Sequence, residues 1–470
     1  MKRKPLIISL ISICVAALSV FPILTMVNAF GLPSVYENTF LGEMKYKIKR
    51  LKETDGKRII LIGGSSVPFG VRSDLIEQYL PDYKVVDFGM YASLGSDIML
   101  DFAKAKINKD DIVIFMPEQH EQTLSMFYNG SAIWQALDGD YQNYWLLPKD
   151  KRERLVGDLY KFSQDKYKYN YLEKIDAGDS IYQKSSFNDY GDIKVGLATY
   201  NTMYGLFDPT TLISFDTSVI HDDLVSYVND FSAYINKKRA TMFYYFAPAN
   251  KLAKQDDSSV EAYYDYISGK FNFDILGNPN DSIMDPEWFY DTNFHLNDSG
   301  SIIYTKKLIQ NIKLALNDTS VTDIDEPMQP EIPEEEKEDG DNSQADNFYY
   351  EETSDGLIIT GIKSVTERMI IPFRVNDKRV IGFTEKVFKI RRGIREIFIQ
   401  SNVRFIYDGS FGGCVDLEKI HINNKKPSSI NVGTNLLGGT DANIYVPQDL
   451  YGSYIASYNF GIYADRIMPE

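Results

Sequence analysis

A fixed 23-residue period near the C-terminus constrains the fold more than any other feature of this sequence. Six apolar residues recur in register: Val380, Phe383, Phe388, Ile394, Ile397 and Ile399 are followed by Val403, Ile406, Phe411, Leu417, Ile420 and Ile422. A period of about 20–29 residues with short Ile-x-Ile strands is typical of leucine-rich repeats. Such repeats bury their apolar faces only against their neighbours. Two full repeats are few, so capping segments must supply much of the burial.

The repeats and the segment Ile444-Tyr445-Val446-Pro447, which precedes Tyr454, resemble the BspA-like leucine-rich repeats of bacterial surface proteins. The resemblance covers about residues 349–470, and we expect the repeat domain to occupy residues 348–470. It implies either a structural spacer or a surface that binds a protein or glycan ligand.

The N-terminus carries an apolar run from Pro5 to Val27 behind three basic residues. A run of roughly 20 apolar residues spans a bilayer, and a basic head favours an N-inside orientation. We therefore expect residues 1–30 to be a single-pass signal anchor, with the rest of the chain outside the cytoplasm. Val27-Asn28-Ala29 also resembles a cleavage site, so cleavage after Ala29 and secretion is the alternative.

Acidic charge is concentrated in residues 318–347, which carry twelve acidic residues and one lysine, or −11 of the formal −16. Such a segment is predicted to be a disordered, self-repelling linker. The remaining residues lack the basic footprint of a nucleic-acid-binding protein. Cys14 and Cys414 give no disulfide framework, which is compatible with a Gram-positive type surface. Four histidines and no CxxC motif predict no metal and no cofactor.

Between the anchor and the linker, short apolar runs alternate with helical patterns. Strands are predicted over 57–62, 84–88, 111–116 and 241–246, and helices over 75–80, 96–106, 224–235 and 301–315. This alternation predicts an α/β domain with a parallel sheet over residues 57–317. Residues 31–56 are predicted to form a helical stalk. Residues from about 122 to 222 are predicted to be an insertion where substrate recognition could lie.

Two distant segments carry catalytic residue types. Gly63-Gly64-Ser65-Ser66 follows the first strand, at the sheet edge where open α/β sheets bind ligands. His295 lies in a loop before the last helix, with Asp291 four residues ahead of it. A serine nucleophile needs a histidine base, and the base needs an orienting group.

These segments resemble blocks of the SGNH (GDSL-like) hydrolases, and the resemblance implies a flavodoxin-like three-layer fold. Gly64-Ser65-Ser66 is similar to the family's Gly-Asp-Ser block, which implies Ser66 as the nucleophile. His295 matches the histidine of the last block, and Asp291 would orient it. Gly89 falls where the second block places a glycine of the oxyanion hole, which the backbone N–H of Ser66 would share.

The sequence departs from the family in two places. The family's Asp stands three residues before the His, whereas Asp291 stands four before it. The third block, with its Asn, is missing, and Pro117-Glu118-Gln119-His120 follows the third strand instead. Gln119 or Asn250 is then the candidate for the missing amide donor. The overall pattern looks closer to the membrane-anchored branch that includes acyltransferases for cell-surface polymers.

Two functions follow from these observations. The first is an extracytoplasmic serine esterase or O-acyltransferase acting on a cell-envelope polysaccharide or another acylated glycan. The second is a catalytically inactive surface protein that binds or adheres through its repeats. Hydrogen-bond reach between Ser66 Oγ and His295 favours the enzyme, and a separation beyond about 6 Å favours the binding protein.

Overall fold

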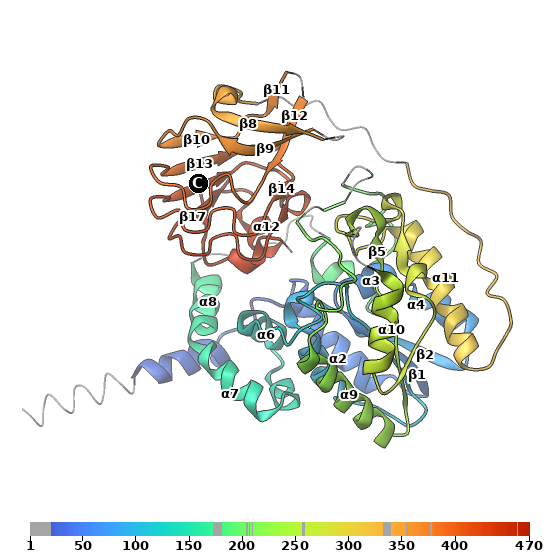
Figure 1. The fold of residues 1–470 in the computed structure, drawn as a ribbon. Coiled ribbons are helices and arrows are strands. Elements are labelled where there is room, and N and C mark those ends of the chain that lie inside the picture. Colours follow the sequence, from blue (N-terminus) through green and yellow to red (C-terminus); the bar gives the residue numbers. More distant parts are fainter. Residues whose placement is uncertain are drawn as a thin grey trace, which may run out of the picture.

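The computed structural model describes the whole chain except residues 1–19, 173–180, 204, 206, 209, 256–258, 332–339, 354–355, 377 and 458. The described chain forms an α/β unit and a repeat unit that lie against each other (Figure 1). The α/β unit is a mixed structure built on a parallel sheet, as the alternating pattern predicted.

The sheet of the α/β unit has five parallel strands in the order β2-β1-β3-β4-β6. Their bounds are β1 (Lys57–Gly63), β2 (Tyr83–Asp87), β3 (Ile112–Met116), β4 (Thr241–Tyr244) and β6 (Asp274–Ile275). The four predicted strands are thus present, and the short β6 is an addition at one edge. A second, two-stranded sheet pairs β5 (Ala249–Asn250) with β7 (Ile283–Met284).

Helices cover both faces of this sheet because successive residues of each strand point to opposite sides. Ile59 and Leu61 of β1 pack on one side with α3 (Ser66–Gly70), α4 (Ser73–Tyr79) and α11 (Asp298–Ala315). Ile60 and Ile62 pack on the other side. The helices there are α2 (Met44–Glu53), α5 (Ser96–Ala103), α9 (Asp222–Lys237) and α10 (Val260–Lys270).

The stalk predicted over residues 31–56 is wrong, because these residues are part of the α/β unit. Helix α2 buries Met44, Ile48 and Leu51 against the sheet. It also buries Lys47, whose Nζ lies 3.1 Å from Asp87 Oδ1 and donates to the Gly191 carbonyl at 2.8 Å. Although its composition is polar, the helix therefore has a buried apolar face and contributes Lys47 to a buried ion pair.

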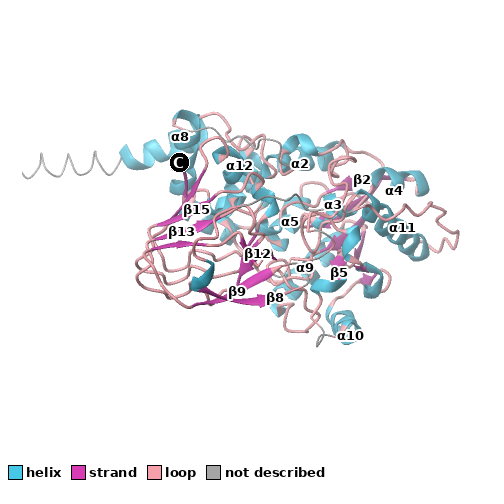
Figure 2. Cartoon of the chain, turned by 90° about the horizontal axis from the view of Figure 1, so that it is seen from above, coloured by secondary structure: helices cyan, strands magenta, loops and turns pink. Residues whose placement is uncertain are grey.

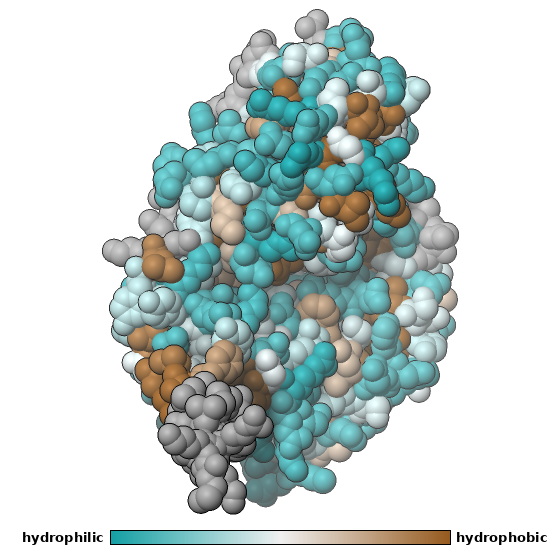
Figure 3. All heavy atoms as spheres, turned by 90° about the vertical axis from the view of Figure 1, so that its left-hand side faces the viewer, coloured by the Kyte–Doolittle hydropathy of each residue, from teal (hydrophilic) through white to brown (hydrophobic). Residues whose placement is uncertain are grey.

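The predicted anchor lies mostly in residues 1–19, outside the described residues. Residues 20–26 are helical and continue into η1 (Val27–Gly31). In the described part of the chain, no helix combines the length and apolar character needed to cross a bilayer. Large apolar side chains gather on the surface where the described chain begins (Figure 3): Val20, Phe21, Ile23, Leu24, Met26 and Val27 are each more than half exposed.

The chain docks onto the α/β unit immediately after this exposed segment. Ala29 is fully buried, and its carbonyl accepts hydrogen bonds from Tyr141 at 2.8 Å and Lys166 at 3.1 Å. The ring of Phe30 contacts Trp134 and Tyr141 edge to face. Cleavage after Ala29, the alternative from the sequence, would therefore have to occur before this segment packs.

Residues 122–222 were predicted to be an insertion; their first half is helical, and the described residues of their second half are largely irregular. The helical elements are α6 (Gly130–Leu137), η4 (Tyr141–Leu146), α7 (Lys149–Gly157), α8 (Leu159–Tyr171) and η5 (Lys184–Ser186). The insertion packs beside α2 and holds the N-terminal segment against the α/β unit.

The repeat unit is a stack of coils, and residues 23 positions apart in the sequence lie next to each other in neighbouring coils. One parallel sheet contains β10 (Arg368–Ile370), β13 (Glu396–Ile399), β15 (Lys419–Ile422), β17 (Asn443–Val446) and β18 (Ile467–Pro469). The second contains β8 (Phe348–Glu352), β9 (Leu357–Ile362), β12 (Lys378–Phe383), β14 (Phe405–Ile406) and β16 (Asn431–Val432), and β11 (Arg374–Val375) pairs with β12. Residues one period apart pair directly, as Ile397 does with Ile420 and Phe383 with Ile406.

The described parts of the acidic segment contact the folded units at a few points. Residues 318–331 follow α11, where Thr322 N–H donates to Gln310 Oε1 at 2.9 Å and Lys306 pairs with Glu326 at 3.1 Å. Residues 340–347 pack on the repeat unit, and Asp341 N–H donates to Gln400 Oε1 at 2.7 Å. The most acidic part, residues 332–339, lies outside the described residues, and the disorder of the linker stays a prediction.

The two units meet where the last coils of the repeats reach the insertion. Helix α12 (Tyr451–Ala456) and η11 (Gly461–Tyr463) lie beside α8. Lys168 Nζ donates to the Tyr451 hydroxyl at 3.2 Å, and Lys161 Nζ lies 3.3 Å from Asp465 Oδ2. In the view from above, α8 and α12 lie near the first of these contacts, beside the repeat strand β15 (Figure 2).

Candidate active site

Ser65 stands at the turn from β1 into α3, at the carboxyl edge of the sheet. Its Oγ lies 2.7 Å from His295 Nε2. The predicted pairing of Ser66 with His295 is therefore wrong by one residue. Ser66 is the first residue of α3. Within the described structure, its Oγ has no partner at hydrogen-bonding distance and angle. Of the two adjacent serines only Ser65 is seen to contact His295, and the sequence alone did not separate them.

His295 is held on its other side by Asp291. His295 Nδ1 lies 2.8 Å from Asp291 Oδ1, so the predicted contact between these residues is present. The separation of four residues, one more than in the resembling family, is accommodated by a turn at Thr292, whose Oγ1 accepts from the backbone N–H of His295 at 3.0 Å. Because a carboxylate accepts hydrogen bonds, the proton sits on Nδ1 and Nε2 is left to accept from the Ser65 hydroxyl.

Tyr182 and Phe69 complete the surroundings of the histidine. The Tyr182 hydroxyl donates to Asp291 Oδ2 and lies 3.2 Å from His295 Nδ1. The ring of Phe69 stacks on the imidazole with centroids 4.1 Å apart and planes within 5°. Ser65, His295 and Asp291 are 1%, 1% and 5% exposed. The three side chains therefore form a buried and fixed Ser-His-Asp arrangement.

The expected oxyanion donors are engaged within the protein. The N–H of Gly89 donates to Asp87 Oδ1 at 2.8 Å, and the N–H of Ser66 donates to Glu118 Oε1 at 2.9 Å. Gln119 Nε2 donates to the Ser214 carbonyl at 2.9 Å, and Asn250 Oδ1 accepts from the Leu252 N–H at the start of η6 (Lys251–Ala253). Of the two side-chain amides proposed as substitutes, Gln119 thus has its donor nitrogen engaged, whereas Asn250 contributes its acceptor oxygen to a neighbouring loop.

Glu118 follows β3 and reaches the serine turn. It is 3% exposed, and its Oε2 makes no hydrogen bond of full geometry among the described residues. Burial raises the pKa of Glu118, while the N–H of Ser66, the charge of His295 and the nearby hydroxyls of Ser66 and Ser65 act in the opposite direction. The site therefore holds a fourth titratable group beside the triad.

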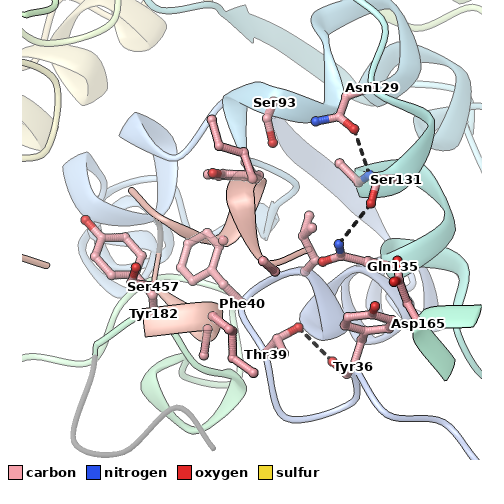
Figure 4. Close-up of a pocket in the computed structure, with 18 of the residues that line it drawn as sticks. Tyr36, Thr39, Phe40, Ser93, Asn129, Ser131, Gln135, Asp165, Tyr182 and Ser457 are labelled. Carbon is pink, nitrogen blue, oxygen red and sulfur yellow. Dashed lines mark hydrogen bonds between the residues drawn. The ribbon is translucent and has the colours of Figure 1, made fainter. Parts of the chain in front are cut away.

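A pocket lies between the insertion and the repeat unit (Figure 4), and one of its lining residues is Tyr182, whose hydroxyl donates to Asp291. Aromatic rings and hydrogen-bonding side chains line it together: Tyr36, Phe40, Tyr91, Tyr169 and Tyr182 with Ser93, Asn129, Ser131 and Gln135. The repeat unit supplies the opposite wall through Ile455, Ser457 and Ile462. Gln135 Nε2 donates to Ser131 Oγ at 3.3 Å. The pocket is thus composite, and its lining is mixed in polarity.

Charged groups stand at the same pocket. Lys161 Nζ lies 3.5 Å from Asp165 Oδ2 on α8 and 3.3 Å from Asp465 of the repeat unit. Burial raises the pKa of Asp165; Lys161 lowers it and Asp465 raises it further. No three His, Cys, Asp or Glu side chains within the described ranges converge as a metal site requires.

Sequence reasoning missed Ser65, Tyr182 and Glu118 as residues of the site. Gly63-Gly64-Ser65-Ser66 offers two serines in sequence, and what distinguishes Ser65 is that β1 ends at Gly63 and the turn follows at once. Tyr182 is 113 residues from His295 in the chain, and no local pattern marks it. Glu118 was visible in place of the family's third block, but no role was assigned to it.

Searches against models of protein families and against curated proteins find no match to this chain.

Proposed function

We propose that this protein is an extracytoplasmic, membrane-anchored serine esterase or O-acyltransferase acting on an acylated glycan of the cell envelope. The observation that carries the proposal is the contact of Ser65 Oγ with His295 Nε2 at 2.7 Å, with Asp291 on the far side of the imidazole. Ser65 attacks the acyl carbonyl, His295 takes its proton, and Asp291 stabilises the imidazolium that forms. The acyl-enzyme then passes its acyl group to water or to a glycan hydroxyl.

The architecture supports the resemblance to SGNH hydrolases. The strand order β2-β1-β3-β4-β6 corresponds to the order of flavodoxin-like sheets, and the serine turn lies at their ligand-binding edge. The stacked 23-residue coils likewise support the resemblance to BspA-like repeats. The alternative of an inactive binding protein expected the serine and the histidine to stand apart. The contact of Ser65 with His295 supports the enzyme instead.

The composite pocket supports a glycan as substrate. Sugar rings present apolar faces and hydroxyl edges, and the pocket offers aromatic rings together with amide and hydroxyl groups. Its proximity to Tyr182 would bring a bound glycan close to the triad. The exposed apolar side chains of residues 20–27 are consistent with attachment at a membrane surface, where envelope polymers are modified.

Labelling with a fluorophosphonate probe tests the proposal, because the probe reacts with activated serines. The full-length wild type and Ser66→Ala should be labelled, and Ser65→Ala and His295→Ala should not. Ser66→Ala is the matched control, since it removes a neighbouring hydroxyl from the same turn. No labelling of a folded wild type would refute the enzyme, and labelling lost only in Ser66→Ala would refute the assignment of Ser65.

A further inference from the structure

Glu118 stands beside the serine, against a backbone donor of the kind that binds a forming oxyanion. Its Oε1 accepts from the backbone N–H of Ser66, the residue directly after the nucleophile, at 2.9 Å. In serine enzymes whose nucleophile sits on a sharp strand-to-helix turn, the N–H of that next residue binds the oxyanion. The carboxyl group therefore stands beside both the attacking hydroxyl and the donor that the transition state needs.

The serine turn is shaped to admit this carboxyl group. A side-chain carbon on Gly64 would collide with both carboxyl oxygens of Glu118. Glycine at position 64 thus leaves room for Glu118 rather than for substrate. The carboxyl group packs against Gly64, and its Oε1 accepts from the N–H of Ser66. Its other oxygen, Oε2, is buried and has no partner at hydrogen-bonding distance and angle among the described residues.

The charge state of Glu118 decides what that oxygen does. An ionised carboxylate beside Ser65 would repel the negative charge that develops on an acyl oxygen. Burial raises the pKa of Glu118 and favours the neutral acid, and the hydrogen bond from the backbone N–H of Ser66 is the largest influence that opposes this. A carboxylic acid held neutral by its surroundings has one O–H and acts as a hydrogen-bond donor. With Oε1 accepting from Ser66, Oε2 is the oxygen on which the neutral acid would carry that proton.

We propose that Glu118 is a catalytic residue whose neutral carboxyl group donates a hydrogen bond from Oε2 to the oxyanion of the acyl-transfer reaction. It takes the role that a side-chain amide would fill, and the amide nitrogen of Gln119, one candidate for that role, instead donates to the Ser214 carbonyl. This inference rests on the proposed serine chemistry and adds the residue that stabilises its transition state.

The step balances without any further reactant. Ser65 Oγ bonds to the acyl carbon, its proton moves to His295 Nε2, and the carbonyl π electrons move to the acyl oxygen. The oxygen accepts a hydrogen bond from Glu118 Oε2–H, and the proton stays on Glu118. When the intermediate collapses, the electron pair re-forms the carbonyl, and the leaving alkoxide takes the proton from His295.

The test compares wild type, Glu118→Gln and Glu118→Ala as full-length proteins in hydrolysis of p-nitrophenyl acetate between pH 5 and 9. Glutamine keeps a donor in the same shape but does not ionise. We expect kcat of Glu118→Gln at neutral pH to stay within about 10-fold of wild type. In wild type the rate should fall at higher pH as Glu118 ionises, and this fall should be absent in Glu118→Gln. Glu118→Ala should lower kcat by about 10²–10³-fold, the usual effect of removing one oxyanion donor.

Two outcomes would overturn the role of Glu118. If Glu118→Gln were as slow as Glu118→Ala in an active enzyme, the donor would not be what matters. If either variant were faster than wild type, the carboxyl group would be blocking the Ser66 N–H. Should Glu118→Ala fail to fold, the pH profile of Glu118→Gln decides alone. Fluorophosphonate labelling of wild type is measured alongside, because an unlabelled and inactive wild type refutes the serine chemistry itself.

Discussion

Ser65 and His295 are separated by 230 residues in the chain, yet Ser65 Oγ lies 2.7 Å from His295 Nε2. The turn after β1 supplies one residue and the loop before α11 supplies the other. Both segments end at the carboxyl edge of the sheet, which brings them together. The hydroxyl proton of Ser65 therefore has a direct acceptor, and the imidazole has a fixed partner at its other nitrogen.

Replacing Asp291 by asparagine should lower kcat by about 10⁴-fold, because the amide favours the wrong tautomer of the histidine. The Nδ1 of His295 lies 2.8 Å from Asp291 Oδ1, and asparagine keeps the size of the side chain. The melting temperature should change little. Hydrolysis of p-nitrophenyl acetate measures the effect, and a loss of less than 10-fold would speak against a catalytic triad.

Tyr182→Phe should reduce kcat by about 10-fold or more while it leaves the ring in the pocket. The Tyr182 hydroxyl donates to Asp291 Oδ2, and a hydrogen bond to a charged group contributes about 1.5–3 kcal/mol. Tyr36→Phe, which changes another ring of the same pocket, is the control and should leave kcat near wild type. Equal losses in both variants would mean that the hydroxyl of Tyr182 has no special role.

Lys47→Met should destabilise the α/β unit by about 3–5 kcal/mol, since it leaves a buried carboxylate without its partner. Lys47 and Asp87 are both fully buried, and their charged atoms are 3.1 Å apart. Adding Asp87→Asn to Lys47→Met should recover part of the loss. Denaturant unfolding measures both variants. A double variant no more stable than Lys47→Met would contradict this account of the pair.

Asp192→Asn should flatten the dependence of stability on pH between about 4 and 7. Asp192 accepts from the backbone N–H of Ser73 at 2.9 Å and from its hydroxyl at 2.6 Å. Burial, and then the charge of Asp87, raise the pKa of Asp192 to about 7, while Ser73 and Lys47 act in the opposite direction.

The sign follows from the extra proton that folded Asp192 holds. Its unfolded pKa is about 3.9, so the stabilisation is complete below that pH and is lost as the pH rises towards 7. The melting temperature of wild type should fall relative to Asp192→Asn over this range. Melting curves recorded from pH 4 to 8 measure the difference, and parallel curves for the two proteins would contradict it.

The regular elements were predictable because their patterns are local. The continuous apolar run at residues 57–62 is β1, and the 23-residue period reappears as the direct pairing of Ile397 with Ile420. His295 and Asp291 were also predictable, since a histidine loop ahead of the last helix places both at the sheet edge. Each of these inferences needs only residues that are close in sequence or repeated at a fixed spacing.

The parts that were not predictable depend on the details of turns and on distant packing. Whether Ser65 or Ser66 faces His295 depends on where α3 begins, and a shift of one residue turns a side chain away. Tyr182 lies in the insertion, far along the chain from Asp291, to which it donates a hydrogen bond. Glu118 is buried, whereas glutamate side chains are usually exposed. Helix α2 was predicted to be part of a stalk because its many lysines are typical of an exposed helix, but Met44, Ile48 and Leu51 are buried.

The wall that Ile455, Ser457 and Ile462 give to the pocket makes its shape depend on the last coils of the repeat unit. The contact of Ser65 with His295, in contrast, is made entirely within the α/β unit. A chain shortened by a nonsense mutation before Tyr451 would keep both residues of that contact but would lack one side of the pocket.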